Sequence, residues 1–102
     1  RLAYDQTQEQ LRYTKRLVAN EVQTALDARA EAIDRLHLQA RVVQAAERSY
    51  ALIRGRYQQG LVKFTELTDA ELALRQAQSN RLQAIYDLRV ADVDLDKATG
   101  QD

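Results

Sequence analysis

A seven-residue spacing of apolar and small residues runs along most of the 102-residue chain. In the first half, alternating steps of four and three connect a seam made of Val18, Val22, Ala25, Arg29, Ala32, Leu36, Gln39, Val43, Ala46, Tyr50, Ile53 and Tyr57. In the second half the same steps connect Leu67, Ala70, Leu74, Ala77, Arg81, Ala84, Leu88, Ala91, Leu95 and Ala98. Spacing of this kind over four or more heptads is typical of coiled-coil helices. With no Pro and only three Gly in the chain, we predict two long helices, over about residues 1–58 and 64–98.

The residues between the two predicted helices, 59–63, have the properties of a short turn. Gly60 can end the first helix in the left-handed conformation that only Gly adopts freely. Lys63 is the expected N-cap of the second helix, which puts Glu66 near the positive end of the helix dipole. Because so short a loop makes the two helices antiparallel neighbours, we predict an all-α fold, a long antiparallel two-helix coiled-coil hairpin.

The register of this hairpin follows from the two seams. If the chain folds symmetrically about Gly60, facing residues have numbers that add to about 120, and the seams match under this rule. Most of the resulting layers set a large residue against a small one, as in Tyr50 with Ala70 or Val43 with Ala77, which favours close packing of the helices. Two layers contain polar or charged residues: Gln39 lies opposite Arg81, a polar layer, and Arg29 lies opposite Ala91. The two arms carry opposite net charges, +3 for residues 1–59 and −3 for residues 60–102.

Few residues in the chain could carry chemistry. It has no Cys, and its only His, His37, has no second His beside it in the pattern. The alternating acids Asp92, Asp94 and Asp96 lack the Gly and Glu of a calcium-binding loop. We therefore expect no cofactor, no metal site and no enzymatic activity. The formal net charge is zero, so the chain also lacks the excess of positive charge that is typical of nucleic-acid-binding proteins.

The predicted hairpin is incomplete by itself. At 1.5 Å per residue the first helix is about 87 Å long and the second about 52 Å, so the first twenty residues or so have no partner. A second apolar stripe also runs beside the seam of the first helix, through Ala19, Leu26, Ile33 and Ala40. A helix that is apolar on two sides needs neighbouring helices on both sides to remove these faces from water. We therefore expect the chain to be a piece of a larger protein in which many helices form a bundle or barrel.

The most distinctive residues lie around the turn. The run Arg56-Tyr57-Gln58-Gln59-Gly60-Leu61-Val62 is followed by Glu66-Leu67-Thr68-Asp69-Ala70-Glu71. These runs resemble the tip and the returning helix of the C-terminal periplasmic hairpin in TolC-like outer-membrane factors, the outer-membrane efflux proteins. The ending, from Ala84 through Leu95 to Gly100, is similar to the closing pattern of that hairpin, and residues 18–32 resemble the upstream part of its long helix.

The resemblance implies a trimeric channel of the Gram-negative outer membrane, in which each subunit contributes two hairpins to a twelve-helix periplasmic α-barrel. In this family the barrel is a passive conduit that docks on a periplasmic adaptor and, through it, serves an inner-membrane pump. Contact with the membrane itself is made by β-strands that are absent from this chain. Residues 1–102 are accordingly expected to form a single periplasmic hairpin, a fragment of that channel.

The resemblance also implies roles for individual residues at the tip. Glu66 and Asp69 match acidic residues that face the lumen and form the narrowest, cation-attracting rings, and Tyr57 matches a tyrosine of the gate that holds the tips together. The tip residues Gly60, Leu61, Val62 and Lys63 are the expected adaptor contact. The family's best-known member has its gate arginine at the position of Val62, whereas here the basic residue is the next one, Lys63.

Each of these roles has a simpler structural alternative. Glu66 and Asp69, three residues apart on one helix face, can act as first-turn acids that complement the helix dipole. Tyr57 can be the last layer of the hairpin core. Leu61 and Val62 can be apolar residues that pack within the loop.

Two other classes of protein fit parts of the pattern. The periplasmic adaptor, or membrane-fusion protein, also has a heptad hairpin with a tip glycine, but the unequal arms and the Tyr57-x-x-Gly60 motif disfavour it. An unrelated coiled-coil interaction domain predicts a self-contained hairpin with polar outer faces. A lipoyl-like flanking sequence would indicate the adaptor, and an upstream repeat of the hairpin would indicate the channel.

Overall fold

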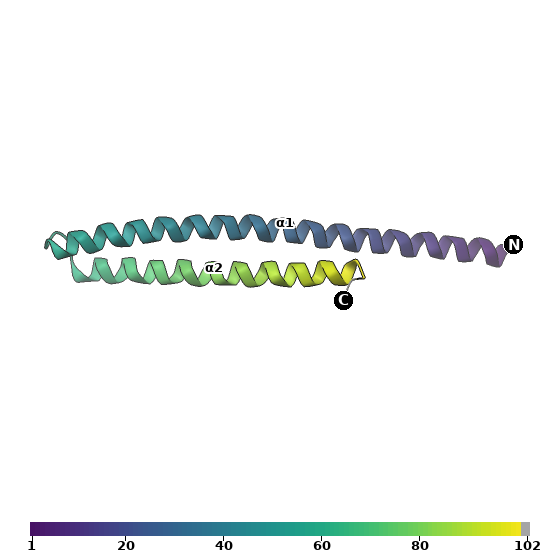
Figure 1. Ribbon diagram of the computed structural model, residues 1–102. Helices are drawn as coiled ribbons and strands as arrows, with labels where there is room; N and C mark the ends of the chain where they lie inside the picture. The colour runs from purple at the N-terminus through teal and green to yellow at the C-terminus, as the bar shows by residue number, and fades with distance from the viewer. Residues whose placement is uncertain (101–102) are drawn as a thin grey trace.

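The computed structural model describes residues 1–100, which form an extended helical hairpin (Figure 1). The first helix, α1, spans Leu2–Gln58, and the second, α2, spans Phe64–Ala98. The molecule measures 87 × 20 × 16 Å, so its longest dimension equals the length expected for α1. No residue among those described lies in a β-strand. The predicted all-α hairpin of two long antiparallel helices is therefore confirmed.

The buried residues of the hairpin all lie on the two predicted seams. Ala32 and Val43 are the buried residues of α1, with 1% and 4% of their surface exposed. The buried residues of α2 recur every seven positions and are all alanines: Ala70, Ala77, Ala84 and Ala91. Larger seam residues such as Leu36, Leu74 and Leu88 are half-buried. The core is thus a narrow line along the contact between the helices, and small residues let the backbones approach closely.

An ion pair at the far end of α2 supports the predicted register. The Arg29 Nε donates to Asp92 Oδ1 at 2.5 Å, and Asp92 is the neighbour of Ala91, the residue predicted to face Arg29. Both side chains keep close to half of their surface exposed, so water screens the pair and it contributes little stability, about 0.2–1 kcal/mol. The sequence pattern placed Arg29 on the seam but did not indicate this partner.

The polar layer in the middle of the hairpin is only partly enclosed. Gln39 is half-buried, whereas Arg81 is exposed although it occupies a seam position. A long side chain such as arginine can cover the seam with its alkyl part while its guanidinium stays in water. Gln39 and Arg81 therefore do not form a polar layer that is enclosed between the helices.

The N-terminal part of α1 extends beyond the end of α2, as Figure 1 shows. Every residue from Arg1 to Glu21 is exposed, including the apolar Leu2, Leu11 and Val18. Neither α1 nor α2 contains a stretch long and apolar enough to cross a bilayer.

Candidate functional site

The loop that connects the helices lies at one end of the rod, and hydrogen bonds of its backbone define its shape. Gly60 has a φ of +76°. Its N–H donates to the Tyr57 carbonyl, and the N–H of Leu61 donates to the Arg56 carbonyl, each at 2.9 Å. This pair of bonds is the Schellman arrangement, which ends a helix and requires the left-handed conformation that favours glycine. The sharp end of α1 at Gly60 agrees with the sequence prediction.

The N-terminus of α2 is formed by the backbone of Lys63. This residue is extended, with φ −80° and ψ 156°, and its carbonyl accepts the N–H of Glu66 at 3.0 Å. No side chain caps this end of the helix. The free N–H groups of the first turn therefore keep a partial positive charge close to Glu66.

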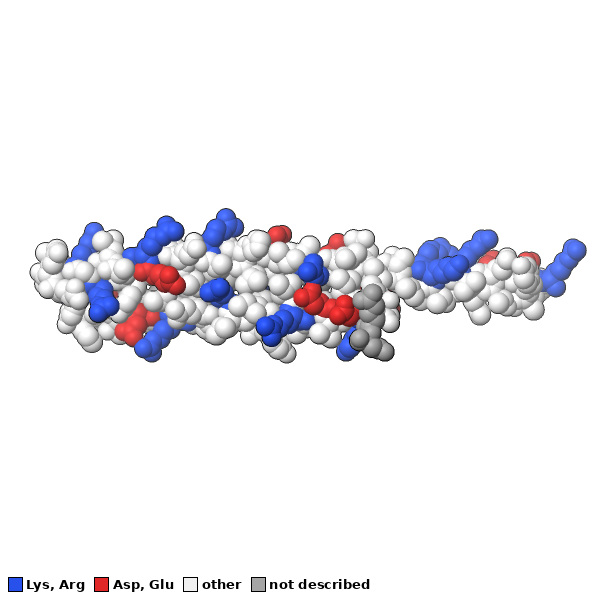
Figure 2. All heavy atoms as spheres, viewed as in Figure 1, with Lys and Arg blue, Asp and Glu red and all other residues white. Residues whose placement is uncertain are grey.

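The loop presents apolar side chains at the end of the molecule. Leu61 is 69% exposed and Phe64 is 64% exposed, while Val62 is half-buried. No atom outside its chain neighbours comes within 4 Å of the position where Gly60 would carry a side chain, so the backbone there faces open space. On the face seen in Figure 2, the extreme end of the tip carries no charged side chain. The end of the rod thus exposes apolar side chains, with the charged Lys63 exposed beside them.

Glu66 and Asp69 lie in the first two turns of α2, and both are exposed. The nearby Glu71 is engaged, because Arg75 donates to its carboxylate at 2.6 Å. Within residues 1–100, neither Glu66 nor Asp69 forms an ion pair. Two carboxylates three residues apart on a helix project to similar sides, so both are available to ions or to other chains.

Tyr57 contacts a residue that the sequence analysis did not single out. Its ring and that of Phe64 lie with centroids 6.0 Å apart and planes tilted by 58°. This geometry is in the range of favourable edge-to-face aromatic pairs. Tyr57 ends the first arm and Phe64 begins the second, so the pair joins the two helices across the loop. The signal available in the sequence was that the chain's only Phe directly follows the N-cap.

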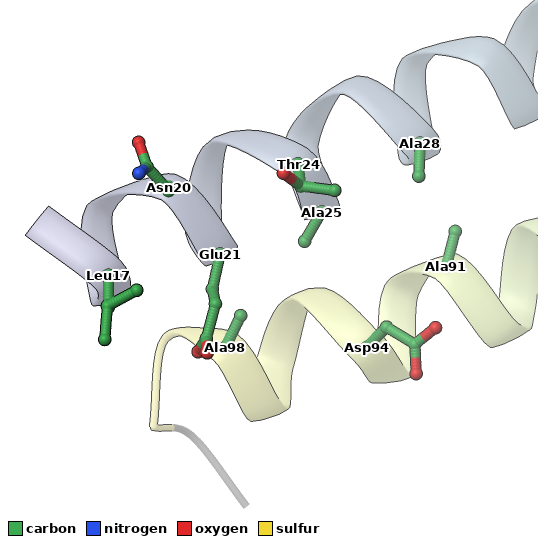
Figure 3. A pocket seen from close by; sticks show the side chains of 9 residues that line it. All are labelled: Leu17, Asn20, Glu21, Thr24, Ala25, Ala28, Ala91, Asp94 and Ala98. Atoms are coloured by element: carbon green, nitrogen blue, oxygen red, sulfur yellow. The ribbon is translucent and has the colours of Figure 1, made fainter.

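A hollow lies at the opposite end of α2 from the tip, where this helix stops beside α1 (Figure 3). It is a groove of about 410 Å³, lined mainly by small or apolar side chains, and the acidic Glu21 and Asp94 are among its lining residues. The residues are Leu17, Asn20, Glu21, Thr24, Ala25, Ala28, Ala91, Asp94 and Ala98. None of them is a predicted site residue. Among residues 1–100 no cluster of three or more His, Cys, Asp or Glu side chains could hold a metal ion.

The comparison of the chain with protein families gives a match over nearly its whole length. Residues 1–101 match the model of the outer membrane efflux protein family. The chain belongs to the outer membrane efflux protein family. No curated protein and no solved structure matched the chain. Membership of the outer membrane efflux protein family confirms the predicted resemblance, and it favours a transport channel over the adaptor hairpin and over an unrelated coiled coil.

The structure brings the predicted site residues of this family member to one end of the hairpin. Tyr57 is in the last turn of α1, Gly60, Leu61, Val62 and Lys63 form the loop, and the two acids follow in α2. Their roles as gate, docking surface and constriction remain predictions.

Proposed function

We propose that this hairpin is a periplasmic tunnel segment of an outer-membrane efflux channel, with its tip at the channel entrance. In the complete protein, three subunits form a twelve-helix α-barrel through which substrates move passively. The hairpin itself performs no chemical reaction. The proposal rests on family membership together with one observation, namely that α1 is apolar on faces that α2 does not cover.

These uncovered faces run along much of α1. Exposed apolar residues beyond the seam include Leu17, Leu26, Leu38, Val42 and Leu52. Ile33 and Ala40, from the predicted second stripe, are only half-buried. A soluble, self-contained hairpin would carry polar residues at such positions. Neighbouring helices on both sides, as in a barrel wall, would remove this apolar surface from water.

The acids at the start of α2 are the proposed constriction. Around a three-fold axis, three copies of Glu66 and three of Asp69 would form two rings of carboxylates. Such rings attract cations and select for them, as in other cation-conducting pores. Support for this role comes from the exposure of both residues and from the lack of an ion partner within the described chain.

The exposed end of the loop is the proposed docking surface for the periplasmic adaptor. Gly60 offers open backbone, and Leu61 offers an uncovered apolar side chain. Val62 and Lys63 complete the surface, with the inner-membrane pump engaged only through the adaptor.

Conductance of the complete channel in planar bilayers tests the proposed constriction. The double substitution Glu66→Ala/Asp69→Ala removes both carboxylate rings, so we expect lower selectivity for cations and weaker block by multivalent cations. A matched control is Glu31→Ala/Asp34→Ala, because these acids have the same spacing and are exposed but lie in the middle of α1. Selectivity and block that stay at the wild-type level in the tip variant would mean that Glu66 and Asp69 only complement the helix dipole.

A further inference from the structure

The contact between Tyr57 and Phe64 joins the proposed gate residue to the other arm of the hairpin. The backbones that carry the two rings are both held in place. The Tyr57 carbonyl accepts the Gly60 N–H at 2.9 Å, and Phe64 directly follows Lys63, whose carbonyl accepts the Glu66 N–H. The five-residue loop between the helices therefore sets the Phe64 ring against the Tyr57 ring at 6.0 Å.

Tyr57 lies at the last position of the seam between the helices. It is 38% exposed, and the aromatic ring that faces it is that of Phe64. A tyrosine side chain in such a position can change rotamer easily unless a neighbour restricts it. The tilted Phe64 ring supplies that restriction, because an edge-to-face pair constrains the direction of both rings.

Phe64 and the acidic pair lie on different sides of α2. Glu66 and Asp69 follow Phe64 by two and five residues, which places them roughly opposite to it at about 3.6 residues per turn. A change at Phe64 can therefore alter Tyr57 without removing charge from the proposed constriction.

We infer that Phe64 is a positioning residue for Tyr57, holding the tyrosine ring so that its hydroxyl is presented in one direction at the closed tip. This inference rests on the proposed function, in which Tyr57 belongs to the gate. It gives the two arms a shared role, because the residue that closes the entrance is on α1 and the residue that orients it is on α2.

Leu72 provides a matched control for this inference. It lies about two turns further along α2, is apolar, and is as exposed as Phe64, at 64%, but it carries no ring to pair with Tyr57 and belongs to no proposed site. Leu72→Ala therefore removes a similar exposed apolar side chain from the same helix and leaves the aromatic pair intact. If Phe64 acted only as exposed apolar surface, Leu72→Ala and Phe64→Leu would have similar effects.

The test is single-channel recording of the complete channel carrying Tyr57→Phe, Phe64→Leu, Phe64→Tyr, Leu72→Ala or the double variant Tyr57→Phe/Phe64→Leu. We expect Phe64→Leu to raise the open probability by about two- to tenfold, the range that corresponds to loss of one aromatic pair. Tyr57→Phe keeps the ring pair but removes the hydroxyl itself, so we expect it to raise the open probability at least as much. The double variant should not exceed Tyr57→Phe, and Phe64→Tyr and Leu72→Ala should each keep wild-type gating. Cation selectivity should stay unchanged in all five variants, which a general disruption of the tip would not allow.

The outcomes separate this inference from the proposed function. If Tyr57→Phe changes gating and Phe64→Leu does not, Phe64 does not position Tyr57, while the gate stands. Additive effects in the double variant, or equal effects of Phe64→Leu and Leu72→Ala, overturn the inference in the same way. If Tyr57→Phe leaves gating unchanged, Tyr57 is not a gate residue, and the inference falls together with that part of the proposed function.

Discussion

Gly55 and Gly60 have opposite effects on the stability of the hairpin, although both have open space where a side chain would lie. Gly55 lies within α1, whereas Gly60 has a φ of +76°, and at neither residue does an atom lie within 4 Å of the position that a side-chain Cβ would occupy. The two positions therefore differ in backbone conformation and not in the room available for a side chain. Glycine destabilises a helix interior but permits the left-handed end of one.

Alanine substitution at these two positions should change stability in opposite directions. We expect Gly60→Ala to lower the free energy of unfolding by about 1–2 kcal/mol, because a Cβ is strained in the left-handed region. Gly55→Ala should raise it by about 0.5–1 kcal/mol, because alanine favours the helix. Urea denaturation followed by circular dichroism measures both. Equal destabilisation by the two substitutions would contradict the assigned end of α1.

For single residues, the sequence predicts backbone conformation better than it predicts side-chain contacts. The end of α1 at Gly60 followed from one property of glycine. The exposed Arg81, the Arg29–Asp92 pair and the Tyr57–Phe64 contact did not follow, because long or aromatic side chains choose among several rotamers and partners. Such choices depend on the three-dimensional course of the loop and on access to water, which periodicity does not encode.

Of the two helices, α2 contributes only alanines to the buried contact between them. Its buried positions are alanines at seven-residue intervals, and the predicted partner of Ala77 is Val43, which is also buried. The regular spacing is what made the helices and their register predictable from sequence. The groove beside Ala98 was not foreseen, because it arises where one helix stops and the other continues.

Enlarging one of these alanines should disturb the contact between the helices. We expect Ala77→Leu to lower the free energy of unfolding by about 1–3 kcal/mol, the usual cost of overpacking a tight core. Ala73→Leu is the control, since Ala73 is exposed on the same helix and the substitution should change stability by less than about 0.5 kcal/mol. Thermal unfolding of the two variants gives the comparison. If Ala77→Leu is as mild as Ala73→Leu, the seam does not pack as described.

In the whole chain, the N-terminal extension of α1 is structurally separate from the hairpin that α2 forms with the rest of α1. Residues 1–16 are exposed throughout and extend past the end of α2. The groove beside Ala98 begins only at Leu17. An isolated helix of this length is only marginally stable in water, so this segment adds little to the stability of the hairpin.

Removal of this extension should leave the hairpin intact. We expect deletion of residues 1–16 to change the free energy of unfolding of the remaining hairpin by less than about 0.5 kcal/mol, because no buried contact is lost. The same deletion should reduce self-association of the isolated chain, since it removes exposed Leu2, Tyr4, Leu11 and Tyr13. Denaturation and sedimentation velocity measure the two effects. A large loss of stability would show that the extension supports the hairpin after all.

The shape of the hairpin also has a mechanical consequence. A rod 87 Å long and at most 20 Å wide is a long lever arm, with the loop at one end. If the rod pivots at its far end, a tilt of about 5° carries the loop sideways by roughly 8 Å, an amplification typical of rigid-body hinge motions. Because the rod tilts as a rigid body, a displacement of that size at the loop requires no rearrangement along the seam between the helices.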